Sequence, residues 1–496
     1  MNETEPLLQG SASEQYGEAV SAVAHQAEQH LDPTLKFDPN GDEDNPLEWS
    51  NAYKWAIVGL IALNAFTVTT TCTSAVPIAN MIVSDLSDGQ VDRSAATLLV
   101  TLWELGESAG PLLIAPLSEV FGRAVVYNVC NTLFTITVML TALCQSAPLF
   151  ITLRAATGLF VAANVLSPAV IGDMFLPDHR GGPMSVIFLA PLTAGAVGPA
   201  IAGAIAQSIG WRSVMWICAL VAGSCEVAFL FCFRETYSVP ILRRRAEKRR
   251  EGLGLSAEEI KAKKAASYAE LKSSIQRPAA VMGSSFVLAS MSLFGSVYFA
   301  QFYVMSVSFP PILEDLYGLT PAQAGSCLIG WSVGSMAAVM LCNVFLDRIY
   351  VRLRDAAKNS GIPEYRLPLT IVGAILLPLP LAVFGWFTQW RLPIAALIVA
   401  SSLVMVSVML VLVTLSSYVV DAFGLYSASA MTGVIISRCL MGSFLPLTAA
   451  PLVERLDYGW GFTVLAAVPF SLMPIPMLVM RYGPRWRQWS RYTREQ

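Results

Sequence analysis

Long apolar stretches separated by short polar ones run along almost the whole chain. Twelve of them approach the length of about 20 residues that crosses a bilayer as a helix. Since lipid offers no hydrogen bonds to backbone groups, each stretch is expected to be helical. The twelve predicted spans cover approximately residues 54–77, 93–114, 124–146, 149–174, 183–207, 212–233, 280–305, 321–346, 368–388, 392–418, 426–450 and 460–481.

A polar stretch over residues 234–280 separates the sixth span from the seventh and contains twelve Lys and Arg residues. We interpret it as a basic cytosolic linker between two halves, with binding of anionic lipid as an alternative role. The predicted fold class is an all-α membrane protein with twelve transmembrane helices in two pseudo-symmetric six-helix bundles. The bundles are expected over residues 51–233 and 281–481, and residues 482–496 are expected to form a cytosolic C-terminal tail.

Charge indicates how the chain is oriented in the membrane. Only 14% of the 496 residues are charged and 55% are hydrophobic, whereas soluble domains carry about 25% charged residues. With a cytosolic N-terminus, 26 of the 32 Lys and Arg residues lie on the cytosolic side, so both termini are expected there. Residues 1–50 hold eleven acidic residues and one basic residue, Lys36, which predicts a disordered acidic tail.

The first residues bear on which membrane the protein occupies. No basic start is followed by a short apolar core, so no cleaved signal peptide is expected. The string Glu3-Thr4-Glu5-Pro6-Leu7-Leu8 resembles a sorting signal for internal membranes. The plasma membrane is the expected location, with the vacuolar membrane as the alternative.

Several kinds of chemistry are excluded by what the chain lacks. No Gly-Lys pair occurs, so a phosphate-binding P-loop is absent and ATP-driven transport is not expected. None of the three histidines lies in a span, which argues against a histidine metal site in the membrane. Gly330-Trp331-Ser332-Val333-Gly334 matches the nucleophile elbow of hydrolases, but it lies inside an apolar helix and suits helix packing instead. We expect no enzyme activity, no metal and no cofactor.

Charged side chains inside a bilayer are costly and usually face a cavity. Glu104 and Glu107 lie three residues apart in the second span, hence on one helix face, roughly 15–20 Å from its outer end. Two carboxylates this close are expected to share a proton, which suits proton coupling, although two structural glutamates would look the same. Arg154, in the outer half of the fourth span, needs an acceptor, and either glutamate could provide it.

Other polar residues within the spans are candidates for lining a substrate cavity. Glu226 suits either the cavity or its inner rim. Arg438 suits either an anionic group of a substrate or backbone carbonyls, and the second is favoured. The remaining cavity candidates are Asn64, Asn131, Asn164, Tyr298 and Gln301. The cavity is expected to be largely apolar with aromatic walls, which fits a hydrophobic or weakly cationic molecule.

Matching strings at the inner ends of two spans suggest gates. Each places an acid near an arginine where a helix leaves the membrane, as in a doubled bundle with an ion pair at each inner hinge. The acids and bases concerned are Glu119 with Arg123 after the second span and Asp347 with Arg348 after the eighth. The fifth span adds Gly195, Gly198, Pro199 and Gly203, which favour a bend beside a close helix contact. A helix that rocks and a static kink are both consistent with this pattern.

Several strings together resemble the major facilitator superfamily, and more narrowly the fungal twelve-span drug:proton antiporters. The resemblance extends from Asn45 to about Arg481, and Ala115 and Ala124 depart from it. The strings that carry it are Pro116-Leu117-Ser118-Glu119-Val120-Phe121-Gly122-Arg123, Arg154 with Gly158, Gly198-Pro199 with Gly203, Glu235-Thr236-Tyr237, Pro363-Glu364-Tyr365-Arg366-Leu367-Pro368, Tyr418-Val419-Val420-Asp421-Ala422-Phe423-Gly424, and Arg438. The resemblance implies that Glu119, Arg123 and Asp173 hold an outward-open state, and that Arg154 takes part in proton coupling.

These observations predict a proton-coupled secondary transporter that exports small organic molecules by alternating access. The alternative is a proton symporter for uptake of a small nutrient, and a sensor that does not transport is a third class. The expected partners are a small-molecule substrate, protons and the lipid bilayer, with no nucleic acid, and the protein is expected to act as a monomer.

Overall fold

The computed structural model describes residues 37, 42–87, 89, 92–176, 179–250, 276–357, 361–490 and 492–493, and every regular element among them is a helix. The predicted sorting string at residues 3–8, nearly all of the acidic tail and residues 251–275 of the linker lie outside the described residues. The predicted all-helical membrane fold is confirmed.

The N-terminal bundle contains six spans. The fourth is interrupted between two helices, and the first ends in a short turn and a further helix. The elements are α2 (Asn51–Thr73), η2 (Val76–Ile78), α3 (Ala79–Leu86), α4 (Arg93–Phe121), α5 (Arg123–Ala142), α6 (Ala147–Leu159), α7 (Ala163–Met174), α8 (Gly181–Ile209) and α9 (Trp211–Cys232).

The C-terminal bundle repeats this plan with more interruptions. Its elements are α12 (Phe286–Tyr317), α13 (Pro321–Cys327), α14 (Ile329–Ala357), η4 (Pro363–Arg366), α15 (Pro368–Leu376), α16 (Pro378–Gln389), α17 (Ile394–Phe423), η5 (Gly424–Tyr426), α18 (Ser427–Phe444), η6 (Leu445–Thr448), α19 (Ala449–Leu472) and α20 (Pro474–Arg487).

Twelve crossings arise from eleven continuous stretches among the described residues. The last stretch, Ser427–Arg487, is 61 residues long, or about 90 Å as a helix, which is three times the thickness of a bilayer core of about 30 Å. Asp457 lies inside it with a φ of 58° and divides it into two crossings.

Several helices are longer than the predicted spans. α4 extends to Phe121 rather than residue 114, and α12 extends to Tyr317 rather than residue 305. Both contain prolines, which a membrane helix tolerates because neighbouring groups satisfy the freed carbonyls. A proline is therefore a weaker stop signal here than in a soluble helix.

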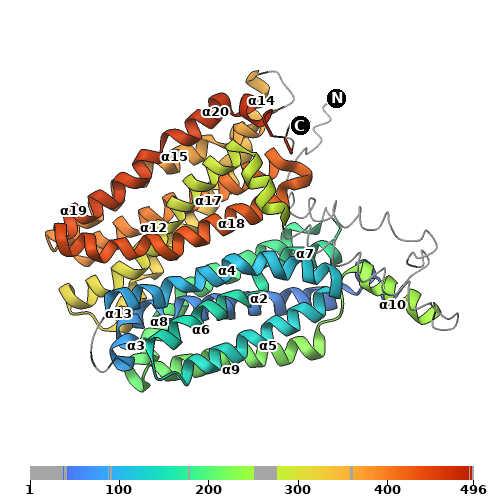
Figure 1. The fold of residues 1–496 in the computed structure, drawn as a ribbon, viewed down its shortest axis with the longest axis horizontal. Helices are drawn as coiled ribbons and strands as arrows, with labels where there is room; N and C mark the ends of the chain where they lie inside the picture. The colour runs from blue at the N-terminus through green and yellow to red at the C-terminus, as the bar shows by residue number, and fades with distance from the viewer. Residues whose placement is uncertain are drawn as a thin grey trace, which may run out of the picture.

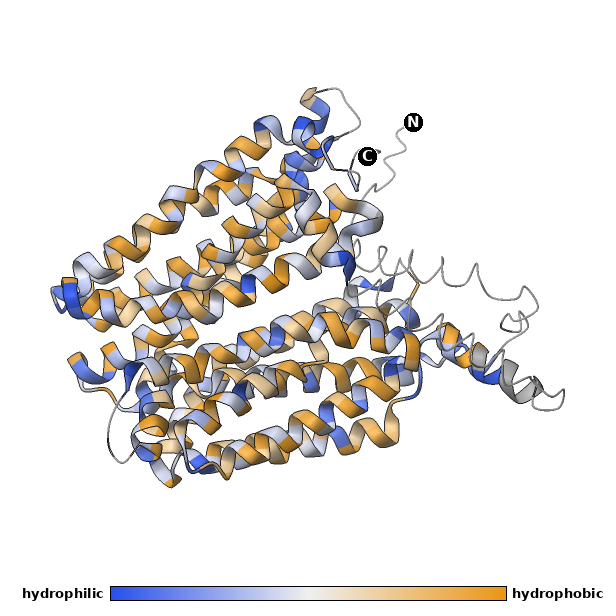
Figure 2. Ribbon diagram, viewed as in Figure 1, coloured by the Kyte–Doolittle hydropathy of each residue, from blue (hydrophilic) through white to orange (hydrophobic). Residues whose placement is uncertain are grey.

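The two bundles lie against each other along their lengths (Figure 1). α4 and α8 of the first face α18, α13 and α14 of the second. Most residues of the long helices are apolar, and strongly polar residues are more frequent near the helix ends (Figure 2). Phe231 is 86% exposed on α9, as expected of a side chain that meets lipid rather than water.

The linker helix α10 (Ser238–Arg250) projects from one end of the molecule, where the C-terminal end also lies (Figure 1). Arg245 donates from Nη1 to Asp42 Oδ2 at 2.6 Å and from Nε to Asp44 Oδ2 at 3.1 Å. These hydrogen bonds raise the pKa of Arg245. Residues 42–50, at the end of the predicted disordered tail, therefore have a defined place beside α10. We call the opposite end of the molecule the outer end, following the predicted orientation.

Candidate functional site

Glu104 lies on the face of α4 that meets the C-terminal bundle. Its side chain is 4% exposed, and Oε1 accepts a hydrogen bond from the hydroxyl of Tyr303 on α12 at 2.6 Å. This hydrogen bond joins the two bundles. Glu104 Oε2 is buried and accepts no hydrogen bond from any described residue.

Glu107 lies one turn further along α4 and is bonded within its own bundle. Asn164 Nδ2 donates to Glu107 Oε1 at 2.9 Å, and Trp103 Nε1 donates to Oε2 at 3.3 Å. The Asn164 side chain is exposed, and Glu107 is half-buried. The structure keeps the two glutamates on neighbouring turns of α4, and Glu104 is the one with a hydrogen bond to the other bundle.

Arg154 on α6 does not pair with either glutamate, contrary to the expectation from the sequence. Nε donates to Leu99 O at 3.2 Å, Nη1 to Thr71 O at 3.1 Å and Nη2 to Cys72 O at 2.8 Å. Its guanidinium also lies 4.7 Å from the Trp103 ring centroid. Because α2 ends at Thr73, the carbonyls in its last turn lack helical partners and are free to accept from the arginine.

Arg438 on α18 supplies the positive charge that acts on both glutamates. Its guanidinium lies 4.5 Å from the Phe299 ring centroid, and Nε is buried without a hydrogen-bond partner among the described residues. Backbone carbonyls, the partners predicted for Arg438, are the partners that Arg154 has in the structure. The charge opposite Glu104 and Glu107 thus comes from the other bundle.

Three cavity candidates gather inside the N-terminal bundle rather than between the bundles. Thr132 Oγ1 donates to Glu226 Oε1 at 3.2 Å, and Asn64 Nδ2 donates to Asn131 Oδ1 at 3.1 Å. These residues lie on α2, α5 and α9, and α5 and α9 are on the side remote from the C-terminal bundle (Figure 1). A polar side chain in apolar surroundings is costly unless it is hydrogen-bonded, so these residues bond to one another within their own bundle.

Two further candidates are buried inside the C-terminal bundle. The hydroxyl of Tyr298 donates to Ala374 O at 2.9 Å and lies 3.1 Å from Pro469 O. Gln301 is fully buried, and neither atom of its amide has a hydrogen-bond partner among the described residues. The hydrogen bonds of Tyr298 thus stay within the C-terminal bundle.

At the inner end of the N-terminal bundle, Arg123 begins α5. Its Nε lies 3.5 Å from Asp173 Oδ2, and its backbone N–H donates to Glu235 Oε1 at 2.8 Å. Gly122 has a φ of 101°, and a Cβ there would collide with the Glu235 carboxylate. Glu235 caps α5, a role that the sequence did not reveal; Glu119 lies in the last turn of α4.

At the inner end of the C-terminal bundle, one arginine joins two acids. Arg366 in η4 donates from Nη1 to Asp347 Oδ1 at 2.6 Å and from Nε to Asp421 Oδ2 at 2.7 Å. Burial acts to lower the pKa of Arg366, but the two carboxylates outweigh it and raise the pKa. Arg348, predicted to pair with Asp347, is exposed, because adjacent residues on a helix point apart. In the sequence, the feature that could have identified Arg366 as the partner of these acids is its place in the string of residues 363–368, which has a proline at each end.

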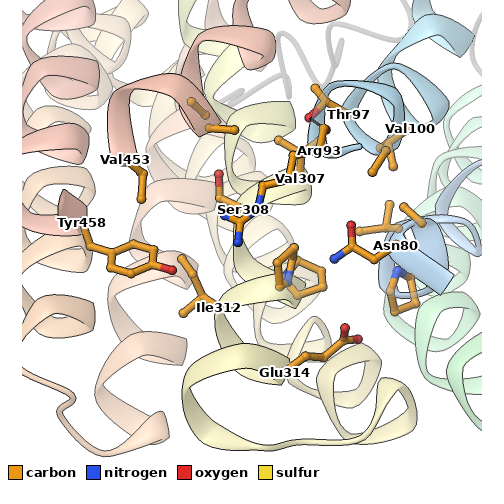
Figure 3. A pocket seen from close by; sticks show the side chains of 18 of the residues that line it. Asn80, Arg93, Thr97, Val100, Val307, Ser308, Ile312, Glu314, Val453 and Tyr458 are labelled. Atoms are coloured by element: carbon orange, nitrogen blue, oxygen red, sulfur yellow. Dashed lines mark hydrogen bonds between the residues drawn. The ribbon is translucent and has the colours of Figure 1, made fainter. Parts of the chain in front are cut away.

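The outer ends of the bundles are held together by polar contacts. Arg93 on α4 lies 3.6 Å from Asp315 on α12, and Thr101 Oγ1 donates to Ser443 O at 2.9 Å. A pocket beside this ion pair is lined from both bundles, with Asn80, Arg93, Thr97, Ser308, Glu314 and Tyr458 among its polar side chains (Figure 3). Among the described residues, polar contacts between the two bundles extend from this outer end inward to the level of Glu104.

The glycines of the fifth span differ in what they face. A Cβ on Gly203 would collide with the carbonyl of Pro321 on α13. Gly325 on α13 in turn meets the carbonyl of Pro199 on α8, so the two backbones touch across the interface. A Cβ atom added to Gly198 would lie 3.1 Å from Thr73 Oγ1 on α2, and one added to Gly195 would lie 3.6 Å from Ser332 Oγ on α14.

Similarity to known proteins agrees with this architecture. The family described as the Major Facilitator Superfamily matches residues 60–446. The chain is 31% identical over 478 residues to "Efflux pump radE" of Floropilus chiversii, covering 96% of this chain and 88% of the relative. It is 31% identical to "MFS transporter cpaT" of Aspergillus oryzae, covering 92% of each.

Among solved structures, a D-xylose-proton symporter superposes with a TM-score of 0.64 at 14% identity, covering 90% of this chain and 99% of the other. A peptide transporter POT superposes with a TM-score of 0.62 at 15% identity, covering 87% of this chain and 95% of the other. At these identities the structures establish the fold alone. The family match and the relatives show that the chain belongs to the Major Facilitator Superfamily of membrane transporters.

Proposed function

We propose that this transporter exports small organic molecules in exchange for protons, by alternating access between its two bundles. The observation that carries the proposal is the buried Glu104 carboxylate at the interface between the bundles, beside the half-buried Glu107. A carboxylate that faces a moving interface can exchange its proton with one side of the membrane and then with the other. The similarity to a protein named as an efflux pump favours export.

The residues suit a cycle in which proton and substrate cross in opposite directions. With the outer ends closed, Glu107 and the exposed Asn164 are the part of the site nearest to solvent. In this state the glutamates release a proton toward the cytosol and the substrate enters the cavity. With the outer ends open, substrate leaves and Glu104 takes a proton from outside.

The inner ion pairs suit gates in this cycle. Arg123 with Asp173 ties α5 to α7, and Arg366 ties η4 to Asp347 and Asp421. In the structure these recorded pairs lie within single bundles. Glu119, Arg123 and Asp173 hold the outward-open state, in which the inner ends of the two bundles approach each other.

The proposed setting is a monomer in the plasma membrane with both termini in the cytosol, since most Lys and Arg residues then face the cytosol. The substrate class is hydrophobic or weakly cationic, and includes drugs, toxins and secondary metabolites. Aromatic rings near the interface, such as Phe299 and Phe302, provide apolar contact for such molecules.

Efflux of fluorescent dyes from yeast that lacks its own pumps tests the proposal. Efflux is expected to stop when a protonophore removes the gradient, and E104Q/E107Q is expected to lose its pH dependence because glutamine carries no exchangeable proton. E454Q, at an exposed outer glutamate, serves as the matched control and should behave like the wild type. Accumulation of dye with the proton gradient would contradict export and favour a symporter, and pH-dependent efflux by the double variant would exclude these glutamates.

A further inference from the structure

We propose that Tyr303 and Arg438, both in the C-terminal bundle, form a clamp on Glu104 that sets how firmly its carboxylate holds a proton in each conformation. The inference rests on the proposed proton-coupled function and adds the two residues that link the charge of Glu104 to the positions of the bundles. Neither tyrosine nor arginine carries the transported proton in this scheme. Both act through Glu104 and are positioning residues.

The first arm of the clamp is the hydrogen bond from Tyr303 to Glu104. The donor and acceptor oxygens are 2.6 Å apart, in the range of a charge-assisted bond between a hydroxyl and a carboxylate. Tyr303 is 6% exposed and Glu104 is 4% exposed, so water does not compete for the bond. An ionised carboxylate only accepts hydrogen bonds, and donation by Tyr303 therefore stabilises its charged form.

The second arm is the charge of Arg438, and one ring places both arms. The Phe299 ring lies 4.5 Å from the Arg438 guanidinium and 5.6 Å from the Tyr303 ring. Arg438 Nε is buried without a hydrogen-bond partner among the described residues, and Glu104 and Glu107 are the carboxylates that interact with its charge. A Cβ atom added to Gly442 would lie 3.3 Å from the Phe299 ring and 3.4 Å from the Tyr303 ring, so a larger residue there would press on both rings.

The other titratable groups around Glu104 do not replace the clamp. Glu107, three residues further along the same helix, is a second carboxylate and cannot stabilise a negative charge on Glu104. Arg154 on α6 is engaged by three carbonyls of its own bundle. The thiols of Cys72 on α2 and Cys439 on α18 also lie near Glu104, and Cys439 faces its carboxylate as a weak donor from the same helix as Arg438. Stabilisation of the Glu104 charge therefore comes from α12 and α18.

Because Glu104 and its two partners are in different bundles, opening the outer ends separates them. Arg93 and Asp315, and Thr101 and Ser443, lie further out and must part first. Once Tyr303 and Arg438 withdraw, the ionised carboxylate loses both supports and takes one proton from the outer solution. Closure restores the two contacts, and the same proton leaves Glu104 toward the cytosolic side by way of water near Glu107.

The test is a pH titration of the purified full-length protein by infrared spectroscopy, with no substrate present. The carboxylic acid band of interest is the one that E104Q removes. Y303F and R438Q are each expected to move its midpoint up by about one pH unit, a tenfold change in proton affinity, because the ionised form loses a support. R438K, which keeps the charge, is expected to stay near the wild-type midpoint.

Y317F is the matched control, because Tyr317 is on the same helix and its hydroxyl bonds to Leu392 O at 2.7 Å, away from Glu104. It should leave the band unmoved. The same variants are then assayed for dye efflux from proteoliposomes across a range of pH on the cytosolic side. Y303F is expected to release protons, and hence to transport, only at a pH about one unit higher.

The outcomes separate the two proposals. Wild-type efflux that depends on pH and is lost in E104Q, together with an unmoved midpoint in Y303F and R438Q, would overturn the clamp alone. An equal shift in Y317F would also overturn it, because the effect would then be structural. Wild-type efflux that ignores the proton gradient would overturn the proposed function and the clamp with it.

Discussion

At the scale of single residues, Arg366 is shared by two carboxylates on different helices. Its side chain is 7% exposed, and that of Asp421 is 16% exposed. R366Q would leave Asp421 and Asp347 close together without a counter-charge, which costs about 3 kcal/mol of folding free energy. The unfolding temperature of the purified protein should fall. R366K should recover only part of the loss, because lysine keeps the positive charge but cannot bond both acids as the planar guanidinium does. Unfolding of R366Q at the wild-type temperature would contradict this account.

Some features of the Glu104 site could be predicted from the sequence, and others could not. The spacing of Glu104 and Glu107 places them on one helix face whatever the rest of the chain does, and the structure has them there. The partners of Glu104 depend on which helices face each other, and residues distant in the chain set that. Hence Arg438 rather than Arg154 supplies the counter-charge, and Tyr303 carried no signal of its own.

At the scale of elements, the contact between α8 and α13 closes the outer half of the interface. Gly203 and Gly325 allow the two backbones to touch, and a side chain at Gly203 would meet the Pro321 carbonyl. G203L should therefore force the outer ends apart and reduce dye efflux by at least about tenfold, since over-packing costs about 1–3 kcal/mol. A membrane-impermeant maleimide should label S308C, in the outer pocket, faster in this background.

G59L is the matched control for that prediction, because a Cβ on Gly59 meets nothing within 4 Å. It should label and transport like the parent. Equal labelling of S308C in the presence and absence of G203L would show that the α8–α13 contact does not control the outer ends.

The membrane-spanning helices were easier to predict from the sequence than the contacts of single residues. Lipid requires long apolar helices, and this requirement makes the twelve spans visible in the sequence. It does not set their ends, because helices such as α14 continue to Ala357 beyond the predicted residue 346, past the apolar region. Nor does it show interruptions such as the one between α6 and α7, which depend on packing inside the bundle.

At the scale of the whole molecule, the ion pair between Arg93 and Asp315 bridges the bundles at their outer ends. Both side chains are about half exposed, so the pair contributes less than about 1 kcal/mol, and less at high salt. R93D or D315R alone should lower efflux by no more than about fivefold and speed labelling of S308C, because like charges then favour an open outer end. The double variant R93D/D315R restores the pair with its polarity reversed, and transport should return toward the parent rate. If the double variant were as impaired as the single ones, the two residues would act separately, and closure of the outer end would depend on the α8–α13 contact and the hydrogen bonds from α4 alone.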